Sequence, residues 1–163
     1  MGSHADAVLA YGYNLGGGEK WEVAEADDDN GLVLPWFSDY EGDGENGNEG
    51  FEEAATARLL ASIDFADRRP DEDYGTFRDR LNAAMARLGV RITSCYCYEF
   101  PTYLLTAEVF EADSGNVQAL DLPDLARRPE TGGWDEKLRA ALTVLGLTPT
   151  RRQPNWLLTA TYG

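Results

Sequence analysis

Histidine occurs only once among the 163 residues, at His4. Residues 1–4 (Met-Gly-Ser-His) resemble the remnant of an expression tag, which leaves residues 5–163 as one predicted domain. Because that domain has no imidazole, nucleophilic catalysis of the Ser-His or Cys-His kind lacks a base of near-neutral pKa. Cysteine is almost as scarce: Cys95 and Cys97 are too few for a zinc site and too close on one strand for a disulfide. We therefore expect reduced thiols, no metal site and no cofactor.

Positive charge is also in short supply. The chain has 14 Lys and Arg residues against 29 Asp and Glu residues, a formal net charge of −15. DNA, RNA and anionic lipid surfaces need protein cations to displace their counterions, so this balance argues against all three as partners. There is no positively charged leader, and no apolar run approaches the ~20 residues that span a bilayer. We expect a cytoplasmic protein with no direct nucleic acid binding and no membrane contact.

Most of the negative charge lies in residues 19–53, the acidic segment. It holds thirteen carboxylates and one base, Lys20, and so carries −12 of the formal −15. Within it, residues 39–50 (DYEGDGENGNEG) contain no apolar residue except Tyr40, which predicts an exposed acidic loop. The thirteen carboxylates are Glu19, Glu22, Glu25, Asp27, Asp28, Asp29, Asp39, Glu41, Asp43, Glu45, Glu49, Glu52 and Glu53.

The acidic segment predicts a non-enzymatic protein-binding module that meets a basic protein surface. Concentrated charge speeds association and makes affinity fall with salt, and mimicry of nucleic acid is the sharper form of this hypothesis. Aromatic residues beside a charged rim are typical of interaction hot spots, although Trp36 and Phe37 could instead cover the end of the core. The predicted contact residues are Trp36, Asp39, Tyr40, Glu41, Asp43 and Glu45.

Two alternatives use carboxylates differently. The spacing Asp39-x-Glu41-x-Asp43-Gly44 resembles the start of a calcium loop, which suggests a calcium-ordered loop Asp39–Gly50, but Gly50 stands where the twelfth-position Glu belongs. The other alternative is an enzyme of carboxylate and arginine chemistry in a cleft near Glu99 and Glu108. Three Arg-Arg doublets could clamp a carboxylate or phosphate, or neutralise the acidic segment: Arg68–Arg69, Arg127–Arg128 and Arg151–Arg152.

The hydrophobic pattern predicts an α+β fold, a mainly antiparallel sheet that carries three helices. Apolar stripes predict helices from Phe51 to Ile63, from Thr76 to Leu88, with a Thr76–Asp79 cap, and from Trp134 to Leu145, the last two ending at Gly89 and Gly146. Alternation and turn residues predict strands at 7–13, 21–26, 32–37, 90–100, 103–111, 116–122 and 155–162, with turns at 16–18 and 100–102.

Two patterns occur twice, in the same order. The sequence LNAAMARLGV at 81–90 is echoed by LRAALTVLGL at 138–147, and PTYLLTA at 101–107 is echoed by PNWLLTA at 154–160. Their order predicts an internal duplication of a helix–strand–strand unit.

Three stretches resemble small uncharacterised proteins of actinobacteria and their phages. They are AVLAYGYNLGG at 7–17, Leu-Pro-Trp-Phe at 34–37 and LGLTPTRRQPNWLLTATYG at 145–163. The resemblance extends over much of the chain and implies an actinobacterial or phage source, but it brings no catalytic motif to any residue.

Overall fold

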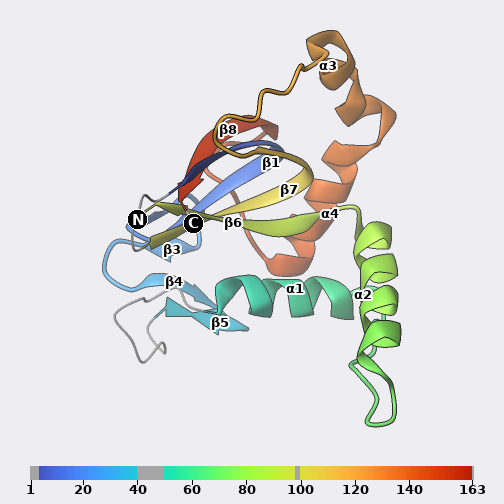
Figure 1. The fold of residues 1–163 in the computed structure, drawn as a ribbon. Coiled ribbons are helices and arrows are strands. Elements are labelled where there is room, and N and C mark those ends of the chain that lie inside the picture. The colour runs from blue at the N-terminus through green and yellow to red at the C-terminus, as the bar shows by residue number, and fades with distance from the viewer. Residues whose placement is uncertain (1–3, 40–49, 98–99, 163) are drawn as a thin grey trace.

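A computed structural model describes residues 4–39, 50–97 and 100–162 of the chain. It confirms the predicted α+β class, with four helices and eight strands in the described part of the chain (Figure 1). In order, the elements are β1 (Ala5–Gly17), β2 (Lys20–Trp21), β3 (Ala26–Asp27), β4 (Gly31–Leu34), β5 (Phe37–Ser38), α1 (Phe51–Ala61), α2 (Tyr74–Leu88), β6 (Arg91–Cys97), β7 (Phe100–Ala112), α3 (Leu122–Thr131), α4 (Trp134–Leu145) and β8 (Asn155–Tyr162).

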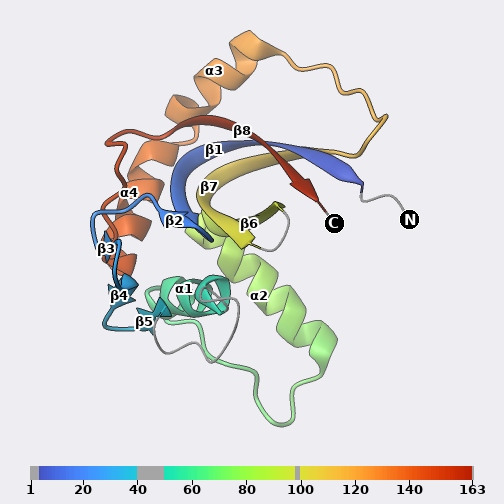
Figure 2. The ribbon, with the colours of Figure 1, turned by 90° about the vertical axis from the view of Figure 1, so that its left-hand side faces the viewer.

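β1 is the centre of the main sheet. One of its edges pairs with β7, and its other edge pairs with β8 and, near Gly16 and Gly17, with β2. β6 extends the sheet beyond β7, and every pairing is antiparallel. The sheet is strongly curved (Figures 1 and 2). Its two outer long strands therefore meet, and the Tyr96 amide of β6 donates to the Thr161 hydroxyl of β8 at 3.0 Å.

A close approach of backbones explains one glycine in β1. The ladder between β1 and β7 is irregular between Tyr11 and Gly12. A Cβ atom at Gly12 would lie 1.8 Å from the carbonyl oxygen of Leu105, so only glycine fits there. This irregularity helps the long strands to bend around the core.

Two predicted strand boundaries near the turns are wrong. Cys97 pairs with Phe100, so residues 100–102 begin β7 instead of forming the turn. The predicted strand 32–37 is two short strands, β4 and β5, that pair with each other at Leu34 and Phe37. Pro35 has no amide hydrogen to donate to a ladder, which is why the chain turns there.

The predicted strand at 116–122 is also wrong, because helix α3 begins at its end. The Asp121 side chain accepts a hydrogen bond from the Asp124 amide at 3.1 Å and so caps the first turn. Pro123 stands in that first turn, where a missing amide hydrogen costs nothing. These are helix-start signals that the strand prediction overlooked.

The other helix ends are close to prediction. Gly89 and Gly146 end α2 and α4 in the left-handed conformation, with φ of 66° and 70°. α2 starts earlier than predicted, at the cap residue Asp73, which accepts from the Thr76 amide at 3.2 Å. Of its predicted buried stripe only Ala84 is buried, because α2 lies at the side of the molecule (Figure 1). Within the described residues no helix combines the length and apolarity needed to cross a membrane.

The main core lies between α1, α4 and one face of the sheet. Phe51, Leu59, Leu105, Leu138 and Leu145 are each almost completely buried there. Apolar burial of this extent is the main source of stability in a domain of this size. A smaller core on the other face of the curved sheet consists of Val8, Ala10, Cys95 and Leu104. Burial raises the pKa of the Cys95 thiol.

The two echoed patterns occupy comparable elements. The first copies, 81–90 and 101–107, form the end of α2 and the start of β7. The second copies, 138–147 and 154–160, form the end of α4 and most of β8. β7 and β8 flank β1 on its two sides. The first unit has the whole of β6 between its helix and its strand. At the corresponding place in the second unit, between α4 and β8, the only pairing in the described residues is an isolated bridge from Pro149 to Val23. The resemblance between the two halves is therefore limited to one helix end and one strand.

Candidate protein-binding surface

Tight turns and a helix start display the described carboxylates of the acidic segment. Glu19 lies in the two-residue turn between β1 and β2, since Gly17 pairs with Lys20. Asp28 and Asp29 lie exposed in the turn between β3 and β4. Glu52 and Glu53 open α1, where their charges complement the positive end of the helix dipole. Local folding thus exposes Glu19, Asp28, Asp29 and Glu53, whereas Glu52 is half-buried and accepts a hydrogen bond from the Ser94 hydroxyl.

Asp27 fixes the conformation of the β3–β4 turn. Its Oδ1 accepts hydrogen bonds from the amides of Asp29 at 2.9 Å and Asn30 at 2.6 Å. Hydrogen bonds from Asn30, on the backbone and then on the side chain, lower the pKa of the Asp27 carboxyl. Asp27 is therefore ionised and engaged in the turn, while its neighbours Asp28 and Asp29 project freely.

Among the described carboxylates of the acidic segment, leaving Asp39 aside, none forms an ion pair with a described Lys or Arg. The arginine doublets form no ion pair with these described carboxylates. Arg127 and Arg128 pair with Asp124 inside their own helix, at 3.9 and 2.9 Å. The 148–150 backbone does run along the segment, since the Thr148 amide donates to Glu25 Oε2 at 2.9 Å, but Arg151 and Arg152 make no ion pair there. The exposed carboxylates are free for an external cation.

Asp39, a predicted contact residue, faces the protein interior. Its Oδ2 accepts hydrogen bonds from the Trp21 indole Nε1 and from the Leu32 amide, the latter at 2.8 Å. Both donors belong to residues that are almost completely buried. Burial raises the pKa of the Asp39 carboxyl, and the two hydrogen bonds oppose that rise only in part. Asp39 therefore connects the residue after β5 to Trp21 of β2 and Leu32 of β4.

Trp36, the predicted aromatic contact, is half-buried and performs a structural task. Its Nε1 donates to the carbonyl oxygen of Leu145 at 2.9 Å, and its ring packs 5.8 Å from the Phe51 ring. Arg58 Nε donates to the neighbouring carbonyl of Val144 at 3.0 Å. Since the last carbonyls of a helix have no partner within it, the two side chains complete the end of α4. These contacts support the alternative interpretation, in which Trp36 covers the end of the core.

The remaining predicted contact residues, Tyr40, Glu41, Asp43 and Glu45, lie outside the described residues. The calcium hypothesis depends on the same stretch. Its first ligand would be Asp39, whose Oδ2 is already engaged by two donors. In the part of the chain that the structure describes, no group of three or more His, Cys, Asp or Glu side chains could hold a metal ion.

Glu108, half of the predicted carboxylate pair, lines a cavity of about 300 Å³ together with Arg91 and Thr106. It is the only carboxylate among the described residues that line this cavity. Glu99 lies outside the described residues. Paired catalytic carboxylates lie about 5–10 Å apart, and the described lining of this cavity supplies no second carboxylate for Glu108.

No protein-family model, curated protein or solved structure matches this chain. The sequence anticipated the concentration of carboxylates in the acidic segment and, as one alternative, the core-covering position of Trp36. The inward orientation of Asp39 had no local signal beyond its place at the end of an apolar strand.

Proposed function

We propose that this protein is a non-enzymatic binding module whose acidic segment meets a basic surface on another protein. One observation carries the proposal: apart from Asp39, the described carboxylates of the segment have no Lys or Arg partner within the described chain. Carboxylates that were needed for the fold would be expected to find such partners, because unpaired like charges repel one another. Here the repulsion is left to be relieved by a cationic partner.

The charge also defines how binding would behave. Complementary charge raises the association rate well above that of uncharged surfaces, and salt screens it over about 8–10 Å. Affinity should therefore fall steeply with ionic strength. The sharper form of the proposal is nucleic acid mimicry, in which the carboxylates occupy the DNA- or RNA-binding surface of the partner and duplex DNA competes with them.

The test is affinity capture from a cell extract with quantitative mass spectrometry, at about 50 and 300 mM salt. The variant D28N/D29N/E53Q removes three exposed charges from the segment. The control variant D71N/D79N/D113N removes three exposed charges elsewhere and changes net charge equally. Basic partners should be retained at low salt by the wild type and the control, and lost by the first variant.

Two results would contradict the proposal. Equal loss in both variants would show that total charge matters and the segment does not. Partners whose retention ignores salt would remove the electrostatic basis altogether. Added duplex DNA should displace the partner if mimicry is correct, and should have no effect if the partner is an ordinary basic protein surface.

A further inference from the structure

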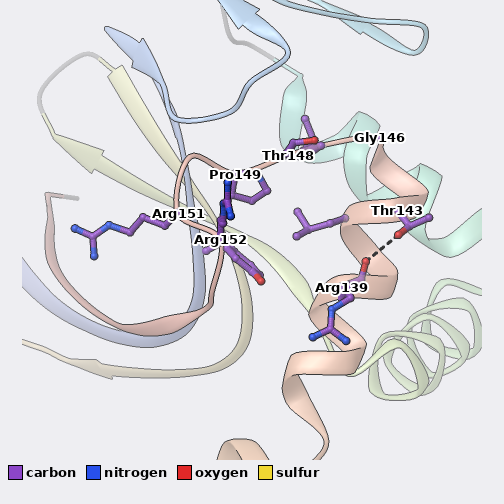
Figure 3. A pocket seen from close by; sticks show the side chains of 10 residues that line it. Arg139, Thr143, Gly146, Thr148, Pro149, Arg151 and Arg152 are labelled. Carbon is purple, nitrogen blue, oxygen red and sulfur yellow. Dashed lines mark hydrogen bonds between the residues drawn. The ribbon is translucent and has the colours of Figure 1, made fainter.

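Three arginines are among the residues that line a cavity beside α4. The cavity has a volume of about 510 Å³ and lies between the second half of α4, residues 146–152 and Tyr13 of β1. Figure 3 shows Arg139 projecting from α4 on one side and Arg152 from the 148–152 segment on the other, with Arg151 extending away from the helix. We propose that this cavity binds the phosphate group of a small organic phosphate monoester.

The charge of the cavity is the first argument. Arg139, Arg151 and Arg152 are three of only 14 cationic residues in a chain of net charge −15. No Asp or Glu is among the described residues that line the cavity, and none of the described carboxylates pairs with these arginines. Three guanidinium groups that line one cavity and form no ion pair with a described carboxylate are an arrangement that an external anion stabilises.

The arginines are not needed to complete the end of α4. The carbonyl oxygens of its last four residues already have donors: Leu147 N for Leu142, Gly146 N for Thr143, Arg58 Nε for Val144 and Trp36 Nε1 for Leu145. This leaves the helix end with little residual negative potential toward the cavity. The usual structural explanation for cations at a helix C-terminus therefore does not apply to these three.

Tyr13 supplies a neutral donor. The residue is only 6% exposed, yet it lines the cavity, and its hydroxyl has no hydrogen-bond partner among the described residues. Burial raises the pKa of this phenol, while Arg139 opposes the rise, so the hydroxyl keeps its proton near neutral pH. A hydroxyl that opens onto a cationic cavity from an otherwise buried residue is suited to donate to an anion's oxygen.

The backbone that presents Arg151 and Arg152 is held in place. Its hydrogen bonds run from the Thr150 amide to the Glu22 carbonyl and from the Ala24 amide to the Thr148 carbonyl, both at 2.9 Å. Pro149 adds a bridge to Val23. A fixed backbone lowers the entropy that is lost when arginine side chains close on a ligand.

The size and surroundings of the cavity define the ligand. Its volume is in the range of small-molecule sites, about 300–1,000 Å³, and is larger than a bare phosphate requires. Leu142, Leu147 and Pro149 provide apolar contacts for the rest of the molecule. A phosphate monoester carries close to two negative charges at pH 7, which suits several guanidinium groups better than one carboxylate does. The net charge of −15 repels a long polyanion, so a small ligand is favoured over nucleic acid.

The experiment is titration with phenyl phosphate at constant ionic strength, followed by calorimetry and by amide chemical shifts. Benzoate and phenol are the carboxylate and uncharged probes. We expect phenyl phosphate to shift the amides of Gly146, Leu147 and Thr148 and to bind at least tenfold more tightly than benzoate. R139Q/R152Q should weaken binding at least tenfold, whereas R78Q/R87Q, which removes two exposed charges from α2, should change it less than twofold.

A second variant protects the test from a loss of folding. Y13F removes only the hydroxyl, which has no described protein partner, so it should weaken phenyl phosphate binding several-fold without lowering the melting temperature. Equal losses in the two arginine variants, shifts away from the cavity, or equal affinity for benzoate would each overturn the assignment. Variants of the acidic segment should leave phenyl phosphate binding unchanged, so this inference stands or fails independently of the proposed function.

Discussion

The indole nitrogen of Trp36 donates a 2.9 Å hydrogen bond to the carbonyl oxygen of Leu145, 109 residues further along the chain. It ties the short β4–β5 hairpin to the end of α4. Leu145 itself is completely buried, so water cannot easily replace the lost donor. The contact explains why an aromatic residue beside an acidic loop belongs to the core, and it leads to the first prediction.

Trp36→Phe should lower the free energy of unfolding by about 1–2 kcal/mol, because the Leu145 carbonyl loses its donor while most ring packing is kept. Urea unfolding measures the effect. Trp134→Phe is the matched control, since that half-buried indole also packs in an aromatic cluster but makes no described hydrogen bond. If the control costs as much as Trp36→Phe, the hydrogen bond does not matter.

Asp39→Ala should lower the free energy of unfolding by about 2–3 kcal/mol, because the buried Trp21 Nε1 and Leu32 amide would both lose their acceptor. Asp39→Asn keeps an acceptor oxygen and should cost less. Chemical unfolding at neutral pH compares the two variants. Equal losses for Ala and Asn would show that the carboxylate acts through its charge and not as an acceptor.

Asp39 also has a pH signature. Because burial raises its pKa in the folded state above the usual value near 3.8, the folded protein holds this proton more tightly than the unfolded chain does. Its contribution to stability is therefore greatest at low pH, falls as pH rises from 3.8 through the folded pKa, and is constant above it. The stability of the wild type relative to Asp39→Asn, measured across this range, should fall in the same window; a flat difference would contradict the shift.

Arg80→Lys should loosen the connection between α1 and α2. The guanidinium donates to both oxygens of Glu72, at 3.0 and 2.9 Å, and to the carbonyl of Ala66 at 2.6 Å. Lysine cannot reproduce this planar fork, so residues 62–73 should be cleaved faster in limited proteolysis. The control Arg78→Lys, on an exposed position of the same helix, should be cleaved at the wild-type rate.

The same contact predicts acid sensitivity. Hydrogen bonds from Arg80 lower the pKa of the Glu72 carboxyl below its usual value of 4.5. The stabilisation is therefore fully present above pH 4.5 and is lost as pH falls through the lower, folded pKa. Protection of 62–73 from an acid-tolerant protease should decrease in that window in the wild type, and should be absent at every pH in Arg80→Lys.

Features that depend only on neighbouring residues can be predicted from the sequence alone. The apolar spacing from Trp134 to Leu145, closed by Gly146, predicts α4 to the residue, because helix periodicity and a left-handed cap are local properties. The concentration of carboxylates in residues 19–53 and the α+β class are readable for the same reason: composition and alternation need no knowledge of distant contacts.

The tertiary structure alone decided which residues meet. Asp39 was expected in a solvent-exposed loop, yet it turns inward because its carboxylate accepts hydrogen bonds from Trp21 and Leu32. Arg139 carries no motif, and it joins Arg151 and Arg152 at one cavity only because α4 packs beside the segment that leads to β8. Contacts between residues that are distant in sequence depend on how amphipathic faces pack and how strands pair. A window of neighbouring residues does not contain that information.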